Sequence, residues 1–376
     1  MADSISVKAS VLHGPRDLRV QDRTLPPLAA GHVRVAVKAT GLCGSDLHYF
    51  RHYRNGDILV REPLTLGHES AGIVTAVGPG PVAALQVGDR VALEVGLPCA
   101  ACDLCAAGRY NICRAIQFRS SAKAYPHAQG TLQEEIVHPA QWCHKCPLSV
   151  ALHAADRAAP LPPGATVLVL GAGAVGLLCA AVSRARGAAA VVVADLQPDR
   201  LGFAVAHGFA DAAVVVPPRR PDSVDAGLAW AREVADLVRS TPVRRRRRDA
   251  EPEPEEVGEV HATFECTGVE SCMQTAMYAT APGGKVLVIG MGTPVQTLPV
   301  AAASLREVDL VGVFRYAHTY PGAIELLASR DPLLPDLTKL ITQRYSGIDN
   351  IHKAFDMAAR VKDDEGKLVL KVMIDM

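Results

Sequence analysis

The chain has 376 residues, more than one hydrophobic core usually organises, so two domains are expected. Its 39 basic and 39 acidic residues balance, which excludes a general electrostatic attraction to nucleic acid or to an anionic membrane surface. The first residues, MADSISVKASVL, lack the charged start and apolar core of a signal peptide, so a cytoplasmic location is expected. Ten cysteines without such a signal indicate metal binding rather than a disulfide framework.

The first third of the chain alternates short β-branched runs with glycine and proline turns. The runs are HVRVAVKAT, SAGIVTAVG and DRVALEV. This pattern predicts a mainly antiparallel β domain.

After about Val150 the pattern changes to alternating strands and helices. The segment TVLVLGAGAVGLLCAAVSRARG followed by AVVVADL predicts a strand, a glycine turn, a helix and a second strand. The uncharged stretch from Ala165 to Ser183 carries three glycines, so it suits a buried strand and helix better than a membrane span. Further β-like runs follow at DAAVVV, ATFECTG, KVLVIGMG and DLVGVF. Together they predict a doubly wound α/β domain with a parallel sheet.

Residues 217–259 do not fit this alternation. They hold a helix-like stretch, VDAGLAWAREVADLVRS, then five arginines at Arg244–Arg248, then EPEPEE. Arginines followed by acids and prolines cannot build a core, so the segment is predicted to be a solvated loop insertion. A nuclear-localisation signal is the alternative interpretation of the arginines, although the acids that follow neutralise them.

Four cysteines lie close together as Cys99-x2-Cys102-x2-Cys105-x7-Cys113. Four thiolates at this spacing can surround one tetrahedral Zn²⁺ and leave no position for a substrate. The pattern therefore predicts a structural zinc site that stabilises a loop.

A second set of metal ligands is spread over GLCGSDLHYF (residues 41–50) and GHESAG (residues 67–72). Cys43, His68 and Glu69 supply a sulfur, a nitrogen and an oxygen ligand. Three protein ligands leave a fourth position for water or a substrate oxygen, which a catalytic zinc requires. A lone cysteine or histidine is usually structural, and the neighbouring four-cysteine motif is what favours the catalytic interpretation.

The motif Gly171-x-Gly173-x-x-Gly176 directly follows the strand TVLVL and opens a helix. Glycines in this pattern permit a tight turn and let the backbone approach a pyrophosphate at the helix N-terminus. Asp195 ends the next predicted strand, where a carboxylate accepts hydrogen bonds from the adenosine ribose and repels a 2′-phosphate. NAD is therefore favoured over NADP, although Arg200 lies close enough in sequence to leave NADP open.

Taken together, these segments resemble the zinc-containing medium-chain dehydrogenases, and most closely the sorbitol (L-iditol) and related polyol dehydrogenases. The resemblance covers nearly the whole chain except the arginine insertion. It rests on GLCGSDLHY, PLTLGHESAG, the four-cysteine motif with GRYNIC, PLSVALHA, GAGAVG, FECTGV, ATAPGGKVLVIGMG and REVDLVGVFRYAHTYP.

The resemblance implies a GroES-like β-barrel catalytic domain, residues 1–147 and 315–376, around a Rossmann NAD-binding domain, residues 148–314. It implies oxidation of a secondary hydroxyl of a small polyol, such as sorbitol or xylitol, by NAD, with zinc as the Lewis acid. A homo-oligomer, commonly a tetramer, is implied as well. Matching positions are assigned as follows: the zinc ligands Cys43, His68 and Glu69, the proton-relay residues Ser45 and His48, and the polyol-site residues Arg315 and Tyr316.

The chain departs from the family pattern at residues 145–147. In the family, about a dozen more residues follow the dipeptide seen here as His144-Lys145, and they end in a glutamate near the catalytic zinc. Here Cys146 stands at that position. Three interpretations are open: a gene model or splice form that lacks the segment, a working variant in which Cys146 approaches the zinc, or an inactive NAD-binding pseudoenzyme.

Overall fold

The β-branched runs of the sequence form strands in two separate units of the computed structural model, which describes residues 5–80, 82, 85–144, 148–246 and 253–376. One unit comprises Met1–Pro147, Tyr320–Glu325 and Leu340–Met376, and the other comprises Leu148–Thr319 and Leu326–Lys339. The sequence placed the return to the first unit at residue 315, whereas residues 315–319 and 326–339 belong to the second unit by their contacts.

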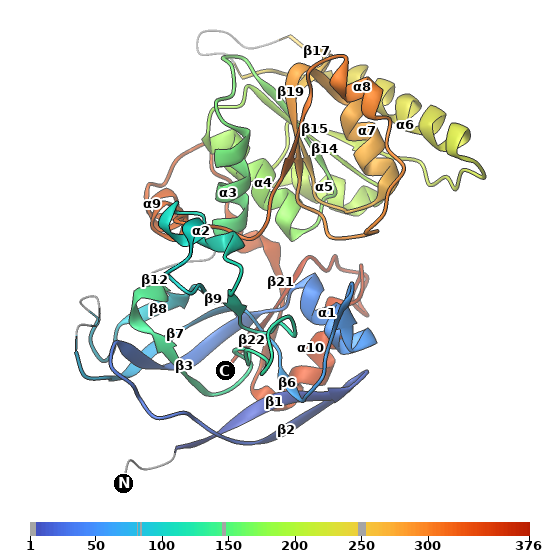
Figure 1. Cartoon of the computed structure of the whole chain (residues 1–376). Helices are drawn as coiled ribbons and strands as arrows, with labels where there is room; N and C mark the ends of the chain where they lie inside the picture. Colours follow the sequence, from blue (N-terminus) through green and yellow to red (C-terminus); the bar gives the residue numbers. More distant parts are fainter. Residues whose placement is uncertain (1–4, 81, 83–84, 145–147, 247–252) are drawn as a thin grey trace. The chain divides into compact units, whose positions relative to one another are not determined.

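The first unit is built on a seven-stranded sheet with the order β12-β8-β7-β3-β22-β21, to which β11 adds by pairing with β3 (Figure 1). Its central strand β3 pairs antiparallel with both β7 and β22, so the last strand of the chain lies beside one of the first. The strands of this sheet are β3 (His32–Gly41), β7 (Glu69–Val77), β8 (Arg90–Leu93), β11 (Glu135–Pro139), β12 (Cys143–His144), β21 (Ile341–Ser346) and β22 (Lys371–Asp375).

A smaller sheet and short hairpins complete the strands of this unit. The smaller sheet has the order β2-β1-β6, and β4 pairs with β5 and β9 with β10. These strands are β1 (Ser6–Gly14), β2 (Asp17–Thr24), β4 (Arg54–Asn55), β5 (Ile58–Leu59), β6 (Leu64–Thr65), β9 (Gly96–Leu97) and β10 (Gln117–Phe118). The antiparallel β domain expected from the sequence is therefore confirmed, although β1 and β2 had not been singled out.

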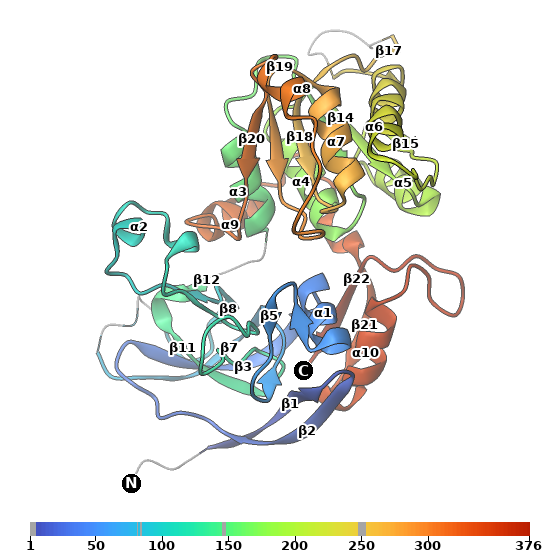
Figure 2. The same cartoon turned by 45° about the vertical axis from the view of Figure 1, so that its right-hand side comes forward.

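Two helices from opposite ends of the chain close the core of this unit. Helix α1 (Gly44–His52) and helix α10 (Ile351–Ala358) lie side by side near β22 (Figure 2). The ring centroids of Phe50 and Phe355 are 4.9 Å apart, and both side chains are buried. The short helices are α2 (Asp103–Ala106) and the 3₁₀ turns η1 (Tyr110–Ile112), η2 (Ala140–Trp142) and η4 (Ile348–Asn350).

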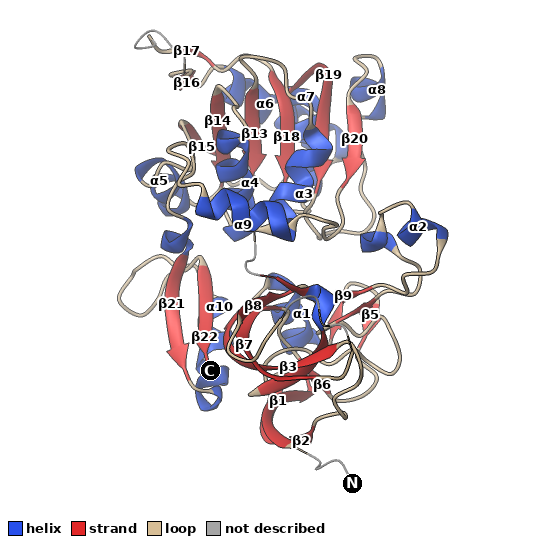
Figure 3. Ribbon diagram, turned by 90° about the vertical axis from the view of Figure 1, so that its left-hand side faces the viewer, coloured by secondary structure: helices blue, strands red, loops and turns tan. Residues whose placement is uncertain are grey.

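The second unit is a six-stranded parallel sheet with the order β15-β14-β13-β18-β19-β20 and helices on both faces (Figure 3). In chain order this is the doubly wound 3-2-1-4-5-6 arrangement, with a switch point between β13 and β18. The strands are β13 (Thr166–Leu170), β14 (Ala190–Asp195), β15 (Ala212–Val215), β18 (Val260–Glu265), β19 (Thr280–Val288) and β20 (Asp309–Gly312). All six match predicted runs, because continuous apolar segments suit strands that are buried on both faces.

Helices connect these strands and supply the remaining core. They are α3 (Ser149–Ala158), α4 (Ala174–Ala185), α5 (Pro198–Ala206), α6 (Val224–Arg239), α7 (Glu270–Ala279) and α8 (Val300–Ser304). Helix α9 (Tyr320–Ala328) and the 3₁₀ turn η3 (Leu337–Leu340) each have residues in both units.

The expectation of a solvated insertion at residues 217–259 is wrong for much of the segment. Helix α6 buries Ala231, Val234, Ala235 and Val238, which share one face because they recur every three or four residues. Two short strands follow, β16 (Pro242–Val243) and β17 (Glu255–Glu256).

The arginines of this segment also contact the second unit. Arg246 Nη1 pairs with Asp211 Oδ1 at 2.5 Å, and its backbone N–H donates to the carbonyl oxygen of Ala189. Arg245 pairs with Glu255 at 3.0 Å and donates to the carbonyl oxygen of Val257. The charge of these arginines predicted that they would be exposed to solvent, but their guanidinium groups donate hydrogen bonds to acceptors within the second unit. Arg247 and Arg248 lie outside the described residues.

Candidate active site and metal centres

The pairing of β3 with β7 brings three of the predicted metal ligands together. Gly41, the last residue of β3, lies opposite Glu69, the first residue of β7, so Cys43 just beyond β3 lies close to Glu69 and to His68. The ligand atoms of Cys43, His68 and Glu69 all lie within 4.8 Å of one another. A side chain at position 41 would collide with the Glu69 carboxylate, because a Cβ there would be 2.7 Å from Oε2.

Asp46 orients the imidazole of His68. The Asp46 carboxylate is fully buried, and its Oδ1 lies 3.2 Å from His68 Nδ1. The same oxygen accepts from the backbone N–H of Gly67 at 3.1 Å and from Ser120 Oγ at 2.7 Å. Because Nδ1 donates to Asp46, the lone pair of Nε2 is left for a metal ion.

Burial alone would raise the pKa of the Asp46 carboxyl, but His68 and the hydrogen bonds from Ser120 and Gly67 overcome burial and lower it. Burial opposes the charged form of His68 as well, yet Asp46 and the Cys43 thiol raise the pKa of His68 well above its ordinary value. The neighbours of His68 thus favour positive charge at this position of the first unit.

Lys371 from the C-terminal strand β22 completes the surroundings of Glu69. Its Nζ forms an ion pair with Glu69 Oε2 and donates to the carbonyl oxygen of Leu42 at 2.9 Å. Burial would lower the pKa of Lys371, but Glu69 and Cys43 raise it, so the ammonium stays charged. The sequence did not identify this residue. The only signal was a lysine inside the apolar run LVLKVMID.

Ser45 and His48 both lie on α1. Ser45 Oγ is 3.4 Å from His68 Nε2, and His48 is exposed one helical turn later. Burial, and then the positive charges of His52 and Arg51, lower the pKa of His48. The two side chains thus lead from the ligand cluster towards solvent.

The four cysteines of the predicted structural site form a second cluster around α2. The Sγ–Sγ distances are 3.5 Å for Cys102–Cys105, 3.5 Å for Cys99–Cys113, 3.9 Å for Cys102–Cys113 and 4.0 Å for Cys99–Cys105. Zn–S bonds of about 2.3 Å in a tetrahedron place sulfurs roughly 3.8 Å apart, so the cluster fits one zinc ion.

The thiols of this cluster differ in acidity. A hydrogen bond from the backbone of Ala101, and then Cys113, lower the pKa of Cys99 to about 6. Burial, and then the neighbouring thiols, raise the pKa of Cys105 to about 12. A cation is therefore needed for all four to be thiolates at neutral pH.

The glycine turn lies at the carboxyl end of β13 in the second unit. Gly171 has a φ of +101°, and a Cβ at Gly176 would be 1.9 Å from the Gly171 carbonyl oxygen, so neither position tolerates a side chain. A Cβ at Gly173, the N-cap of α4, would meet no atom within 4 Å, so packing within the protein does not explain that glycine. Close approach of a ligand phosphate to the helix N-terminus does.

Asp195 stands at the carboxyl end of β14 beside this turn. Its carboxylate accepts from the backbone N–H groups of Ala172 at 2.7 Å and Gln197 at 2.8 Å. Arg200 lies in the first turn of α5 and is partly exposed. The carboxylate is thus held next to the expected pyrophosphate position, which suits recognition of an adenosine ribose.

The remaining predicted residues lie in or beside the second unit. Arg315 has a left-handed φ of +55° and its guanidinium lies 4.6 Å from the ring centroid of Phe314. Tyr316 is buried. Cys146 lies outside the described residues.

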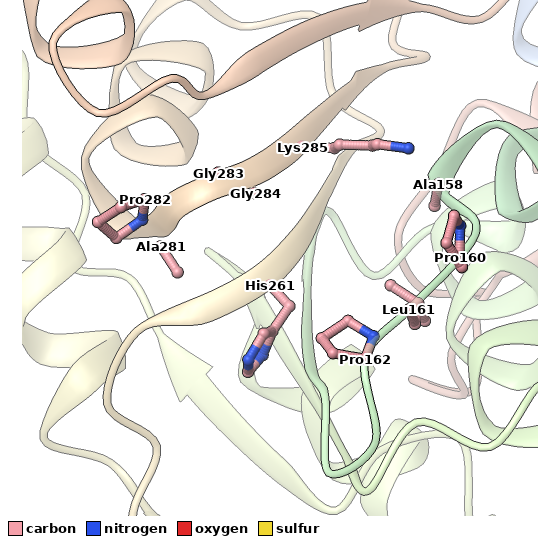
Figure 4. Close-up of a pocket in the computed structure, with 10 residues that line it drawn as sticks. All are labelled: Ala158, Pro160, Leu161, Pro162, His261, Ala281, Pro282, Gly283, Gly284 and Lys285. Atoms are coloured by element: carbon pink, nitrogen blue, oxygen red, sulfur yellow. The ribbon is translucent and has the colours of Figure 1, made fainter.

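A small cavity of about 180 Å³ lies in the second unit at the amino ends of the strands (Figure 4). It is lined by Ala158, Pro160, Leu161, Pro162, His261, Ala281, Pro282, Gly283, Gly284 and Lys285. Ligands of doubly wound sheets bind at the carboxyl ends, so this cavity is not the dinucleotide site.

Comparison with known proteins identifies the family of the chain. Residues 29–148 match the model of the alcohol dehydrogenase GroES-like domain, and residues 174–329 match that of the zinc-binding dehydrogenases. A sorbitol dehydrogenase of Arabidopsis thaliana is 37% identical over an alignment of 382 residues that covers 98% of this chain and 95% of that protein. The chain belongs to the zinc-binding dehydrogenases.

Two further relatives of this dehydrogenase extend the comparison. An L-idonate 5-dehydrogenase of Vitis vinifera is 36% identical over 98% of this chain and 94% of its own length. The crystal structure of an L-idonate 5-dehydrogenase from Escherichia coli superposes with a TM-score of 0.80 at 25% identity, covering 100% of this chain and 99% of the other. Within the described residues, no helix is long and apolar enough to cross a membrane.

Proposed function

We propose that this dehydrogenase oxidises a secondary hydroxyl of a small polyol, such as sorbitol, to the ketose with NAD. The observation that carries the proposal is the cluster of Cys43, His68 and Glu69, whose ligand atoms lie within 4.8 Å of one another. Its mixed ligands and its count of three are typical of a catalytic zinc site, whereas the separate four-cysteine cluster is typical of a structural one.

The first unit's residues would hold the metal and remove the proton. Zinc on these three ligands would lower the pKa of a substrate hydroxyl, and NAD would accept the hydride from the same carbon. Ser45, whose Oγ lies 3.4 Å from His68 Nε2, would take the hydroxyl proton, and the exposed His48 would release it to solvent. One polyol and one NAD⁺ then give one ketose, one NADH and one proton.

The second unit's residues would bind the cofactor and part of the substrate. The turn Gly171–Gly176 would receive the pyrophosphate, Asp195 the adenosine ribose, and Arg200 the rim of the adenosine site. Arg315 and Tyr316 are proposed to bind further hydroxyls of the polyol. The relatives, a sorbitol dehydrogenase and an L-idonate 5-dehydrogenase, support a polyhydroxylated substrate.

The proposal is tested by counting metal and then measuring turnover. We expect two zinc ions per chain by mass spectrometry, and NADH formation from sorbitol at 340 nm. Cys43→Ser should lose one zinc and the activity, whereas Cys105→Ser should lose the other zinc and destabilise the fold. Wild-type protein with zinc in the four-cysteine cluster alone, and without turnover, would overturn the proposal and favour the inactive NAD-binding form.

A further inference from the structure

The segment Gln117–Ser121 lies against the proposed catalytic metal ligands without supplying one. The ring centroids of Phe118 and His68 are 5.6 Å apart, with an interplanar angle of 57°. Ser120 Oγ donates to Asp46 Oδ1 at 2.7 Å, and that oxygen also lies 3.2 Å from His68 Nδ1. The position of this segment therefore affects His68 both through ring packing and through Asp46.

Ser120 holds this position in a strained backbone conformation. Its φ is +64°, a left-handed value that is energetically unfavourable for a non-glycine residue. Such conformations persist only where the surrounding structure imposes them, and they cluster at functional sites. Two backbone hydrogen bonds contribute: Ser120 N–H to Ala128 O at 2.8 Å, and Arg119 N–H to Val95 O at 3.1 Å.

The side chain of Arg119 supplies the rest of the constraint. Its Nη1 donates to the carbonyl oxygen of Gln129 at 3.1 Å, its Nη2 to that of Val137 at 2.6 Å, and its Nε to His138 Nδ1 at 3.1 Å. Burial lowers the pKa of the guanidinium to about 10. Among the ion pairs of the described residues, none joins Arg119 to a carboxylate. The guanidinium is therefore fixed by three neutral hydrogen-bond acceptors and not by an opposite charge.

His138 links this constraint to the connection between β8 and β9. Because His138 Nδ1 accepts from Arg119, its Nε2 carries the proton and donates to the carbonyl oxygen of Glu94 at 3.1 Å. Burial, and then the charge of Arg119, lower the pKa of His138 well below its ordinary value, so the imidazole stays neutral. The Glu94 carboxylate in turn accepts from Tyr110 Oη at 2.7 Å and lies 2.9 Å from His144 Nε2.

We propose that Arg119 is a positioning residue for the metal-binding imidazole of His68. Its guanidinium locks Gln117–Ser121 in the strained shape that directs Ser120 at Asp46 and packs Phe118 on His68. The inference rests on the proposed function only in taking His68 as a ligand of the catalytic metal. It predicts a loss of metal affinity at this site alone.

The test compares Arg119→Met with Arg23→Met. Arg23 is a matched control because its Nη1 donates to Gln129 Oε1 at 2.7 Å and to Thr65 Oγ1, but has no hydrogen bond to Gln117–Ser121. Zinc dissociation constants of both sites are measured by competition with a chromophoric chelator. We expect Arg119→Met to weaken the catalytic site about tenfold, as substitutions behind a metal ligand do, and to leave the four-cysteine site unchanged. Arg23→Met should change neither.

A double-mutant cycle of Arg119→Met with Ser120→Ala measures the coupling between the two residues in zinc affinity. A purely structural role of Arg119 would not produce such coupling. If Arg119 acts through Ser120, the double variant should lose less affinity than the product of the two single losses. Cobalt(II) at the site should show altered visible bands in Arg119→Met. Should that variant fail to fold, Arg119→Lys, which keeps the charge but cannot reach three acceptors, replaces it.

The possible outcomes separate this inference from the proposed function. Unchanged affinity of the catalytic site in a folded Arg119 variant, or simple additivity in the cycle, would overturn the positioning role while turnover of the wild type stands. If Arg119→Met weakens metal binding at the catalytic site but the wild type does not oxidise polyols, the positioning role is supported and the proposed function is wrong. A wild type with metal only at the four cysteines would remove both.

Discussion

At the scale of single residues, the proposed preference for NAD rests on Asp195. Its carboxylate is fixed by the N–H groups of Ala172 and Gln197 rather than by a cation, so its negative charge is available to repel a 2′-phosphate. The proposed preference for NAD therefore depends on charge at one position of the second unit.

We expect Asp195→Asn to raise the ratio of kcat/KM for NADP to that for NAD at least tenfold. The amide keeps one acceptor oxygen for the backbone but no longer repels a phosphate. Steady-state kinetics with both cofactors measure the ratio, and Asp199→Asn, which removes an exposed carboxylate of α5, is the control. An unchanged ratio in Asp195→Asn would assign the preference to another residue.

At the scale of elements, the segment 217–259 is tied into the second unit by Arg246. Its Nη1 lies 2.5 Å and 2.8 Å from the two carboxylate oxygens of Asp211, and its Nη2 donates to the carbonyl oxygen of Ala188 at 2.5 Å. Asp211 also accepts from Arg184 and from the N–H of Val191, so it links this segment to α4 and β14.

Arg246→Ala should lower the free energy of unfolding by about 1–3 kcal/mol, since it removes charged hydrogen bonds to the partly buried Asp211 and the donor to the carbonyl oxygen of Ala188. The exposed neighbour Arg244 provides the matched variant, Arg244→Ala, for which a change within about 0.5 kcal/mol is expected. Urea unfolding followed by circular dichroism measures both. Equal stability of the two variants would mean that the segment is held by α6 alone.

The elements that could be predicted from sequence are those whose pattern is local. The buried strand Thr166–Leu170, the glycine turn and the helix after it follow from apolar runs and from the glycine pattern, in which Gly171 and Gly176 tolerate no side chain. Cys43, His68 and Glu69 could be proposed as ligands because they lie in motifs that resemble those of zinc-containing dehydrogenases, near a four-cysteine motif. Asp46, Ser120 and Arg119 were not, because their roles arise from hydrogen bonds between segments distant in sequence. The prediction for residues 217–259 was wrong because their charged composition predicts exposure to solvent. Composition cannot show that Asp211 lies within hydrogen-bonding distance of Arg246.

At the scale of the whole molecule, the proposed metal site needs both ends of the first unit's sequence. The cluster of Cys43, His68 and Glu69 comes from the N-cap of α1 and the start of β7, but the cation beside Glu69 comes from β22 after the chain has passed through the second unit. The antiparallel pairing of Met373 with Gly41 fixes the register that brings Lys371 to Glu69.

Lys371→Met should therefore weaken metal binding at the catalytic site about tenfold and leave the four-cysteine site filled. The substitution keeps the length and apolar contacts of the side chain in β22 but leaves Glu69 and the carbonyl oxygen of Leu42 without their cationic donor. A freed carboxylate can turn away from the metal, and its charge is no longer balanced within the fold. Lys367→Met, which removes a more exposed lysine that pairs with Glu365, is the control. Chelator competition measures both sites in each variant, and a Lys371→Met protein that keeps wild-type affinity at both would show that the C-terminal strand supports the fold but not the metal.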